Sequence, residues 1–124
     1  IITGTVARKD KGIYFINIGR TDAILPIRET LPGERLKQGD TIKAYIKEVK
    51  PTTKGPEIVL TRTSAEFVAE LFRMEVPEIE DGIVQIKSIV REPGERTKVA
   101  VITKDPTIDP VGACVGMKGT RVQG

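Results

Sequence analysis

The residues that decide the fold are 109–123, which read DPVGACVGMKGTRVQ. Asp109 followed by Pro110 predicts the start of a short helix, with aspartate as its N-cap and proline in the first helical position. That helix is expected to run to about Val115 and to end at Gly116, and a second helix should begin after the loop. A G-x-x-G loop between two helices lets the backbone approach an anion, because two of its four residues carry no side chain.

A loop of this kind clamps the nucleotide backbone in KH domains. In this chain Lys118 would add a positive charge beside the phosphates. Two glycines at this spacing also occur at ordinary corners between helices, so the motif alone leaves both interpretations open. The strand and short helix expected before the loop, and the valines that flank it, favour contact with RNA. The candidate RNA-binding residues here are Gly116, Met117, Lys118, Gly119 and Arg121.

Upstream of the loop, the sequence predicts one helix followed by two strands. Thr63 and Glu66 have the spacing of a capping box, in which the Thr63 hydroxyl meets the amide of Glu66. Apolar residues then recur at helical spacing, and Pro77 ends the helix because its ring disfavours helical geometry in the residue before it. A Pro-Gly turn joins the two strands. The strands are expected to cover residues 83–91 and 96–103.

The first 62 residues have a different pattern, in which short apolar runs are separated by turn residues. Five short strands within some 60 residues favour a small antiparallel β-barrel. Closure of the barrel would leave no long open edge that could pair with another chain. The expected fold class is therefore mixed α and β, with a five-stranded antiparallel barrel followed by a partial α+β unit. The strands are expected near residues 3–8, 14–18, 23–27, 42–47 and 58–60.

The candidate RNA face of the barrel consists of the side chains that alternate with the core. Ile16 and Ile18 are expected inside, so Phe15 should point outward, where an exposed phenyl ring can stack a base. Packing of Phe15 on the end of the barrel or on the neighbouring domain is an equal alternative. On the fourth strand Tyr45 lies between two cations, which suits either a nucleic-acid strip or a solvated edge. The candidate residues of the barrel are Phe15, Lys43, Tyr45 and Lys47.

Composition excludes several kinds of chemistry. The chain has 124 residues, one cysteine and no histidine, so neither a Cys/His zinc site nor a Ser-His or Cys-His nucleophile pair can be assembled. No catalytic motif is visible, and we expect no enzyme, no cofactor and no metal.

Residues 1–62 hold twelve Lys and Arg against seven Asp and Glu, whereas residues 63–124 hold eight against ten. The first half therefore carries the attraction for polyanions, or simply a solubilising surface.

Several stretches resemble the NusA family of bacterial transcription factors, and together they cover essentially the whole chain. Residues 1–62 resemble an S1-type RNA-binding domain, which is an OB-fold barrel. Residues 63–124 resemble the first KH domain (type II), truncated after the G-x-x-G loop. Phe15 keeps one aromatic position of the S1 ligand face, whereas Gly12 and Pro26 stand where others are expected. The stretches that carry the resemblance are 4–6, 22–29, 39–40 and 59–62 in the first half, and 70–79, 91–101 and 109–119 in the second.

The resemblance implies a non-catalytic RNA-binding region of a transcription elongation factor that modulates pausing, termination and antitermination. The implied partners are single-stranded nascent RNA, RNA polymerase and other elongation or antitermination factors. We expect a cytoplasmic monomer with no membrane contact, and a chain that is part of a longer protein. The alternative is a protein-docking module, in which the barrel binds polymerase or another factor and RNA contact is incidental. An S1–KH subunit of an RNA-degradation machine would share the domain order, but residues 109–119 do not resemble that family.

Overall fold

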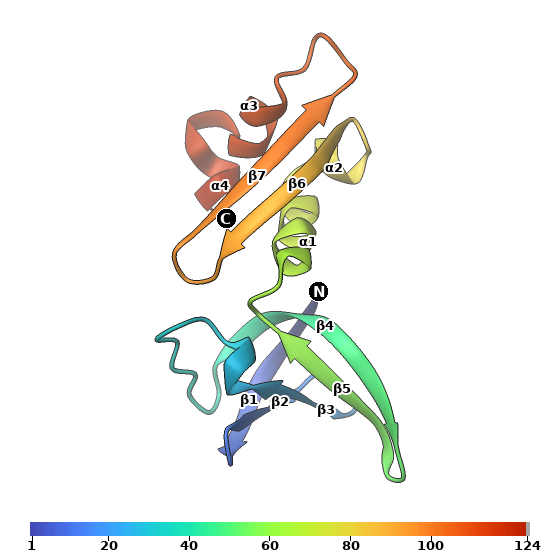
Figure 1. The fold of residues 1–124 in the computed structure, drawn as a ribbon, viewed down its shortest axis with the longest axis vertical. Helices are drawn as coiled ribbons and strands as arrows, with labels where there is room; N and C mark the ends of the chain where they lie inside the picture. Colours follow the sequence, from blue (N-terminus) through green and yellow to red (C-terminus); the bar gives the residue numbers. More distant parts are fainter. Residues whose placement is uncertain (124) are drawn as a thin grey trace. The chain divides into compact units, whose positions relative to one another are not determined.

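The computed structural model describes residues 1–123 and divides the chain into two compact units, Ile1–Phe67 and a second unit that starts at Val68. The first unit contains five strands that close into a barrel in the order β1-β2-β3-β5-β4 (Figure 1). The strands are β1 (Ile2–Asp10), β2 (Ile13–Asn17), β3 (Asp22–Pro26), β4 (Thr41–Thr52) and β5 (Gly55–Thr61), and a 3-10 turn, η1 (Ile27–Glu29), follows β3.

The prediction of an all-antiparallel barrel needs one correction. Four of the strand pairs are antiparallel, but β3 and β5 run parallel and pair at Ile24 and Val59. The chain passes through η1, a loop and the long strand β4 between β3 and β5. Parallel strands cannot be joined by a tight hairpin and need a crossover connection. The segment between β3 and β5 is this crossover, so β5 runs in the same direction as β3.

The core of the barrel follows the predicted alternation of buried and exposed residues. On β2 Tyr14 and Ile16 are buried while Phe15 is half-buried and Asn17 is exposed. Gly4 on β1 allows the strands to approach closely, because a Cβ at this position would lie 2.6 Å from Cγ2 of Ile16. The buried residues that form the core are Val6, Tyr14, Ile16, Ala23, Leu25, Ile42, Ala44 and Leu60.

A buried carboxylate ties the end of η1 to strands β4 and β5. Glu29 is only 8% exposed, and its carboxylate accepts hydrogen bonds from Lys47 Nζ and, at 2.6 Å, from Thr61 Oγ1. Burial alone would raise the pKa of Glu29, but the hydrogen bonds from Lys47 and Thr61 outweigh it and leave the pKa below its usual value. Glu29 therefore stays ionised at neutral pH and holds three elements together.

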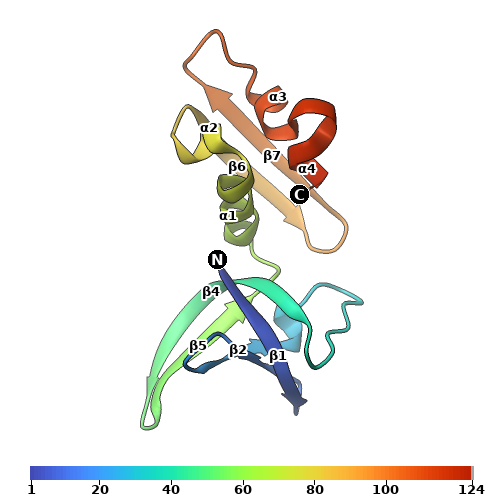
Figure 2. The ribbon, with the colours of Figure 1, turned by 180° about the vertical axis from the view of Figure 1, so that it is seen from behind.

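The second unit contains a two-stranded hairpin with short helices on one face. In Figure 2 the helices α2, α3 and α4 lie in front of the hairpin, and Figure 1 shows its bare face from the other side. The apolar core consists of Val76, Val84 and Cys114, with Phe72 and Val101 among the residues packed on it. The first turn of α1 (Ala65–Glu75) belongs to the first unit, and the rest of this helix belongs to the second. The other elements of the second unit are α2 (Pro77–Glu80), β6 (Val84–Glu92), β7 (Arg96–Thr103), α3 (Pro110–Val115), η2 (Met117–Gly119) and α4 (Thr120–Gln123).

The predicted capping box at the start of α1 is wrong. Ser64 caps the helix instead, since its Oγ accepts a hydrogen bond from the Phe67 amide at 3.2 Å. The Thr63 hydroxyl lies 3.3 Å from the Glu29 carboxylate, so it is engaged with the barrel and the helix begins one residue later than the box requires. The break at Pro77 is confirmed, and the short helix α2 that starts there was not predicted.

Candidate nucleic-acid interface

The G-x-x-G loop, residues 116–119, has a backbone that depends on glycine. Gly116 and Gly119 have φ values of 76° and 75°, in the region that side chains disfavour. Between them Lys118 also has a positive φ, 54°, which is uncommon for a residue with a side chain. The Gly119 amide donates to the Gly116 carbonyl at 3.1 Å and closes the turn. The loop is thus a tight, defined turn.

The middle of the loop faces solvent. Met117 is 82% exposed, and Lys118 is also exposed. Within the described part of the chain, no ion pair involves Lys118. Contact between Lys118 and a ligand phosphate stays a prediction.

Arg121, a predicted RNA contact, has internal hydrogen-bond partners in the structure. Its Nη1 donates to both carboxylate oxygens of Glu78, at 3.0 and 2.8 Å, and to the carbonyl of Ala113 at 2.7 Å. These hydrogen bonds link α4, through the guanidinium, to α2 and to α3. The side chains of Arg121 and Glu78 are both partly buried. The hydrogen bond from Arg121 lowers the pKa of Glu78 below its usual value.

Arg121 also explains why residue 116 must be a glycine. A Cβ at Gly116 would lie 2.7 Å from Cγ and 3.0 Å from the backbone nitrogen of Arg121. The second of these distances involves backbone, which cannot move aside as a flexible side chain can. Among the described residues, a Cβ at Gly119 would meet only the end of the Gln123 side chain, at 3.8 Å. The two glycines of the motif are therefore constrained to different degrees.

On the barrel, the predicted aromatic contact Phe15 is partly covered by an arginine. The guanidinium carbon of Arg8 lies 3.8 Å from the centroid of the Phe15 ring, which is a cation–π stack. The two residues are opposite each other in the register of β1 and β2, next to a bulge in β1. The sequence analysis missed Arg8, although the hairpin turn at residues 10–12 fixes this pairing.

The three candidate RNA-binding residues on β4, Lys43, Tyr45 and Lys47, have different surroundings in the structure. Lys43 is exposed and Tyr45 is half-buried, as expected of an outer face. The register of β4 shifts between Ile46 and Glu48, and Lys47, the unpaired residue of this bulge, forms an ion pair with Glu29. With 47% of its side chain exposed, Lys47 contributes to the positive surface while being held in place by a carboxylate.

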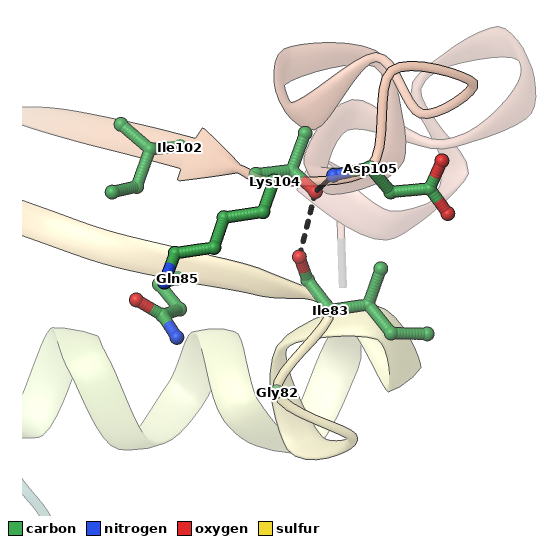
Figure 3. A pocket seen from close by; sticks show the side chains of 7 residues that line it. Gly82, Ile83, Gln85, Ile102, Lys104 and Asp105 are labelled. Atoms are coloured by element: carbon green, nitrogen blue, oxygen red, sulfur yellow. Dashed lines mark hydrogen bonds between the residues drawn. The ribbon is translucent and has the colours of Figure 1, made fainter.

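A pocket lies at the open end of the β6–β7 hairpin, where residues 82–85 meet residues 102–105 (Figure 3). The Thr103 hydroxyl donates to the carbonyl of Ile83 at 2.7 Å and joins the two segments. The pocket contains none of the predicted site residues.

Among residues 1–123, no group of three or more His, Cys, Asp or Glu side chains is arranged to hold a metal ion. Nor does any helix in this range have the length and apolar character needed to span a bilayer.

Comparison with known proteins identifies the two halves. Residues 1–61 match the S1 RNA binding domain, and residues 62–124 match the NusA-like first KH domain. Among curated proteins, the chain is 49% identical to the transcription termination/antitermination protein NusA of Halalkalibacterium halodurans and 50% identical to that of Bacillus subtilis. The NusA of Thermus thermophilus is 46% identical.

These matches cover nearly the whole of this chain but only part of each relative. In all three, the alignment covers 99% of the chain, and it covers 32%, 33% and 32% of the respective relatives. The chain thus spans about a third of the length of the curated relatives it matches. The KH match alone extends over more than half of the residues, and its G-x-x-G loop has the geometry described above. This chain belongs to the NusA family.

Proposed function

We propose that this chain is the RNA-binding region of a bacterial transcription elongation factor and that it catalyses no reaction. In this role it contacts nascent single-stranded RNA and RNA polymerase, and it modulates pausing, termination and antitermination. Other elongation and antitermination factors are further partners, and the cytoplasm is the proposed location. Family membership supports the proposal, because the relatives are named as transcription termination/antitermination proteins.

The observation that carries the proposal is the exposed turn of residues 116–119. Its glycines leave the backbone open to a phosphate, and Lys118 supplies a positive charge without a carboxylate partner in the described chain. A KH loop follows an extended nucleotide backbone. Single-stranded RNA is therefore the preferred ligand over duplex, whose grooves and stacked bases do not present such a backbone.

We assign residues 1–62 to an S1-type OB-fold domain and residues 63–124 to the start of a type II KH domain. The two family matches, which meet between residues 61 and 62, support this division. In the structure the first compact unit ends slightly later, at Phe67. Residues 63–67 contain the cap and first turn of α1, and Thr63 and Phe67 contact Glu29 and Arg62 of the first unit.

The barrel contributes mainly electrostatic attraction. Arg8 presents its guanidinium on the Phe15 ring, and such a plane can itself stack a base while its charge attracts phosphate. Lys43 and Tyr45 extend the same kind of surface on β4, and Lys47 adds a charge that Glu29 partly neutralises. Because Arg8 covers the Phe15 ring and Tyr45 is half-buried, stacking by the barrel is weak, and phosphate contacts dominate its affinity.

The experiment that tests the proposed function is a titration of a fluorescently labelled single-stranded RNA with the chain, followed by anisotropy. Lys118→Asp reverses the charge in the loop, and aspartate tolerates a positive φ. Lys104→Asp makes the same charge change at an exposed position outside the loop and serves as the matched control. We expect a several-fold loss of affinity for Lys118→Asp and a much smaller loss for Lys104→Asp.

Two results would contradict the proposal. Equal losses in the two variants would mean that only net charge matters and that the loop is not the site. No RNA binding by the wild-type chain at low salt would overturn RNA contact and leave the protein-docking module as the better account of the region.

A further inference from the structure

We infer that Glu78 and Arg121 are positioning residues that hold the G-x-x-G loop in its binding conformation, and that Arg121 does not contact RNA itself. The inference rests on the proposed function, because it concerns how the same loop is kept ready for RNA. Sequence analysis placed Arg121 among the RNA contacts, as its position just after the loop suggests. The structure gives its guanidinium a different set of partners.

The first argument is the geometry of the ion pair. Arg121 Nη1 lies within 3.0 Å of both oxygens of the Glu78 carboxylate. The side chains are 32% and 23% exposed, in contrast to 50% and 55% for the surface pair of Arg73 and Glu80. Partial burial reduces screening by water, so the pair restrains the elements that carry it more strongly than an exposed pair does.

The second argument is the set of elements that the pair connects. Glu78 lies on α2, Ala113 lies on α3 before the loop, and Arg121 lies on α4 after it. The hydrogen bond from Arg121 to the Ala113 carbonyl therefore joins the two ends of the loop directly. The Glu78 carboxylate fixes that junction to a third element, packed in the core of the unit through its neighbour Ile79.

The third argument is the close contact at Gly116. The Cγ, Cβ and backbone nitrogen of Arg121 lie within 3.1 Å of the position that a Cβ on Gly116 would occupy. The stem of Arg121 thus packs directly on the first glycine of the motif. Displacement of this side chain would remove the surface against which the turn is formed.

The charge of Glu78 makes the inference testable. A carboxylate near an RNA site repels phosphate, so its removal should strengthen binding if electrostatics alone decides. A positioning role predicts the opposite sign, because Arg121 would lose its anchor. Glu78→Gln therefore separates the two interpretations by the direction of the change in affinity.

The experiment measures single-stranded RNA binding by anisotropy for the wild-type chain, Glu78→Gln, Arg121→Gln and the double variant. We expect each single variant to weaken binding about three- to tenfold and the double variant to be little worse than either, as for residues that act as a pair. Glu80→Gln, which makes the same change on the same short helix, is the matched control and should not weaken binding. Thermal unfolding of every variant shows whether the fold is retained.

The salt dependence distinguishes positioning from phosphate contact. Loss of one phosphate contact on a single strand reduces the slope of log affinity against log salt by about 0.7. We expect Arg121→Gln to leave the slope unchanged. Arg121→Lys keeps the charge, but its ammonium lies one bond short of the Nη1 that reaches Glu78 and Ala113, so it should weaken binding nearly as much as Arg121→Gln. A reduced slope for Arg121→Gln, or full binding by Arg121→Lys, would overturn the inference.

A measurement without RNA keeps the inference independent of the proposed function. Hydrogen exchange of the amides at residues 116–119 should accelerate in Glu78→Gln and Arg121→Gln, while exchange in β6 and β7 stays unchanged. Unchanged exchange in the loop would contradict positioning. If the wild-type chain bound no RNA, the proposed function would fall, and the exchange result alone would decide whether the pair orders the loop.

Discussion

The guanidinium of Arg8 stacks on the ring of Phe15, with its central carbon 3.8 Å from the ring centroid. The one aromatic side chain that the sequence offered as a base-stacking platform is therefore already in contact with an internal partner. A base that approaches this surface meets the cation as well as the ring. The attraction of the barrel for RNA should accordingly depend more on the arginine than on the phenyl ring.

This relationship predicts the relative effects of two substitutions on RNA affinity. Arg8→Gln removes both the charge and the stacked plane, whereas Phe15→Leu retains an apolar surface and the positive charge. We expect Arg8→Gln to weaken RNA binding more than Phe15→Leu, and to reduce the salt dependence. The loss for Phe15→Leu should stay below the roughly 1–3 kcal/mol of a full base stack. Anisotropy titrations at two salt concentrations measure both effects, and a larger loss for Phe15→Leu would contradict the proposed surface.

The two glycines of the loop should differ in their tolerance of alanine. Both have positive φ, so each substitution carries a backbone penalty of order 1–3 kcal/mol. Gly116, with ψ of 170°, lies in a region that essentially only glycine adopts. Gly116→Ala adds a steric conflict with the backbone of Arg121, whereas Gly119→Ala has space. Gly116→Ala should therefore lower the thermal stability of the second unit more than Gly119→Ala. Melting curves followed by circular dichroism test the order, and equal or reversed effects would show that the contact at Gly116 is not a constraint.

The buried carboxylate of Glu29 predicts how the stability of the barrel depends on pH. Its folded-state pKa lies below the usual value, so the folded state binds its proton less readily than the unfolded chain. The corresponding stabilisation is fully present above the usual pKa of glutamate, about 4.3, and is lost as the pH falls through the lower folded value. Chemical denaturation at pH 7 and at progressively more acidic pH measures the loss.

Glu29→Gln should remove this part of the acid sensitivity. The substitution leaves the Lys47 ammonium without its carboxylate partner and should cost about 1–3 kcal/mol at neutral pH. The difference between wild type and variant should shrink as the pH falls. Glu48→Gln, on the exposed part of β4, is the control and should change neither quantity. A constant difference between wild type and Glu29→Gln at all pH values would rule out titration of this group as the cause.

Local sequence patterns predicted most of the elements but not every connection between them. The five strands, the helix break at Pro77, the β6–β7 hairpin and the turn at Gly116 follow from alternation and from turn residues, which act over a few positions. The parallel pairing of β3 with β5 depends on the path of the whole barrel. The helix cap is Ser64 and not the predicted Thr63, because the Thr63 hydroxyl is hydrogen-bonded to Glu29, 34 residues away in the sequence.

In the candidate site too, features set by neighbouring residues could be predicted from the sequence, whereas contacts between distant residues could not. The glycine spacing and the exposure of Lys118 could be predicted, since both depend on the motif itself. The partner of Arg121 could not, because Glu78 lies 43 residues earlier in the sequence. The Arg8–Phe15 stack is an intermediate case, because the register of the hairpin turn pairs these two residues and the bulge in β1 lies beyond them, between Val6 and Arg8.

The most direct test of the central claim is an NMR titration of the isotope-labelled chain with a short single-stranded RNA. Contact through the G-x-x-G loop predicts that the amide signals of residues 116–119 shift progressively with RNA, and that the shifts diminish with added salt. Amides on the bare face of β6 and β7 should remain unchanged and serve as the internal reference. RNA that shifts signals elsewhere while leaving residues 116–119 unaffected would contradict the account.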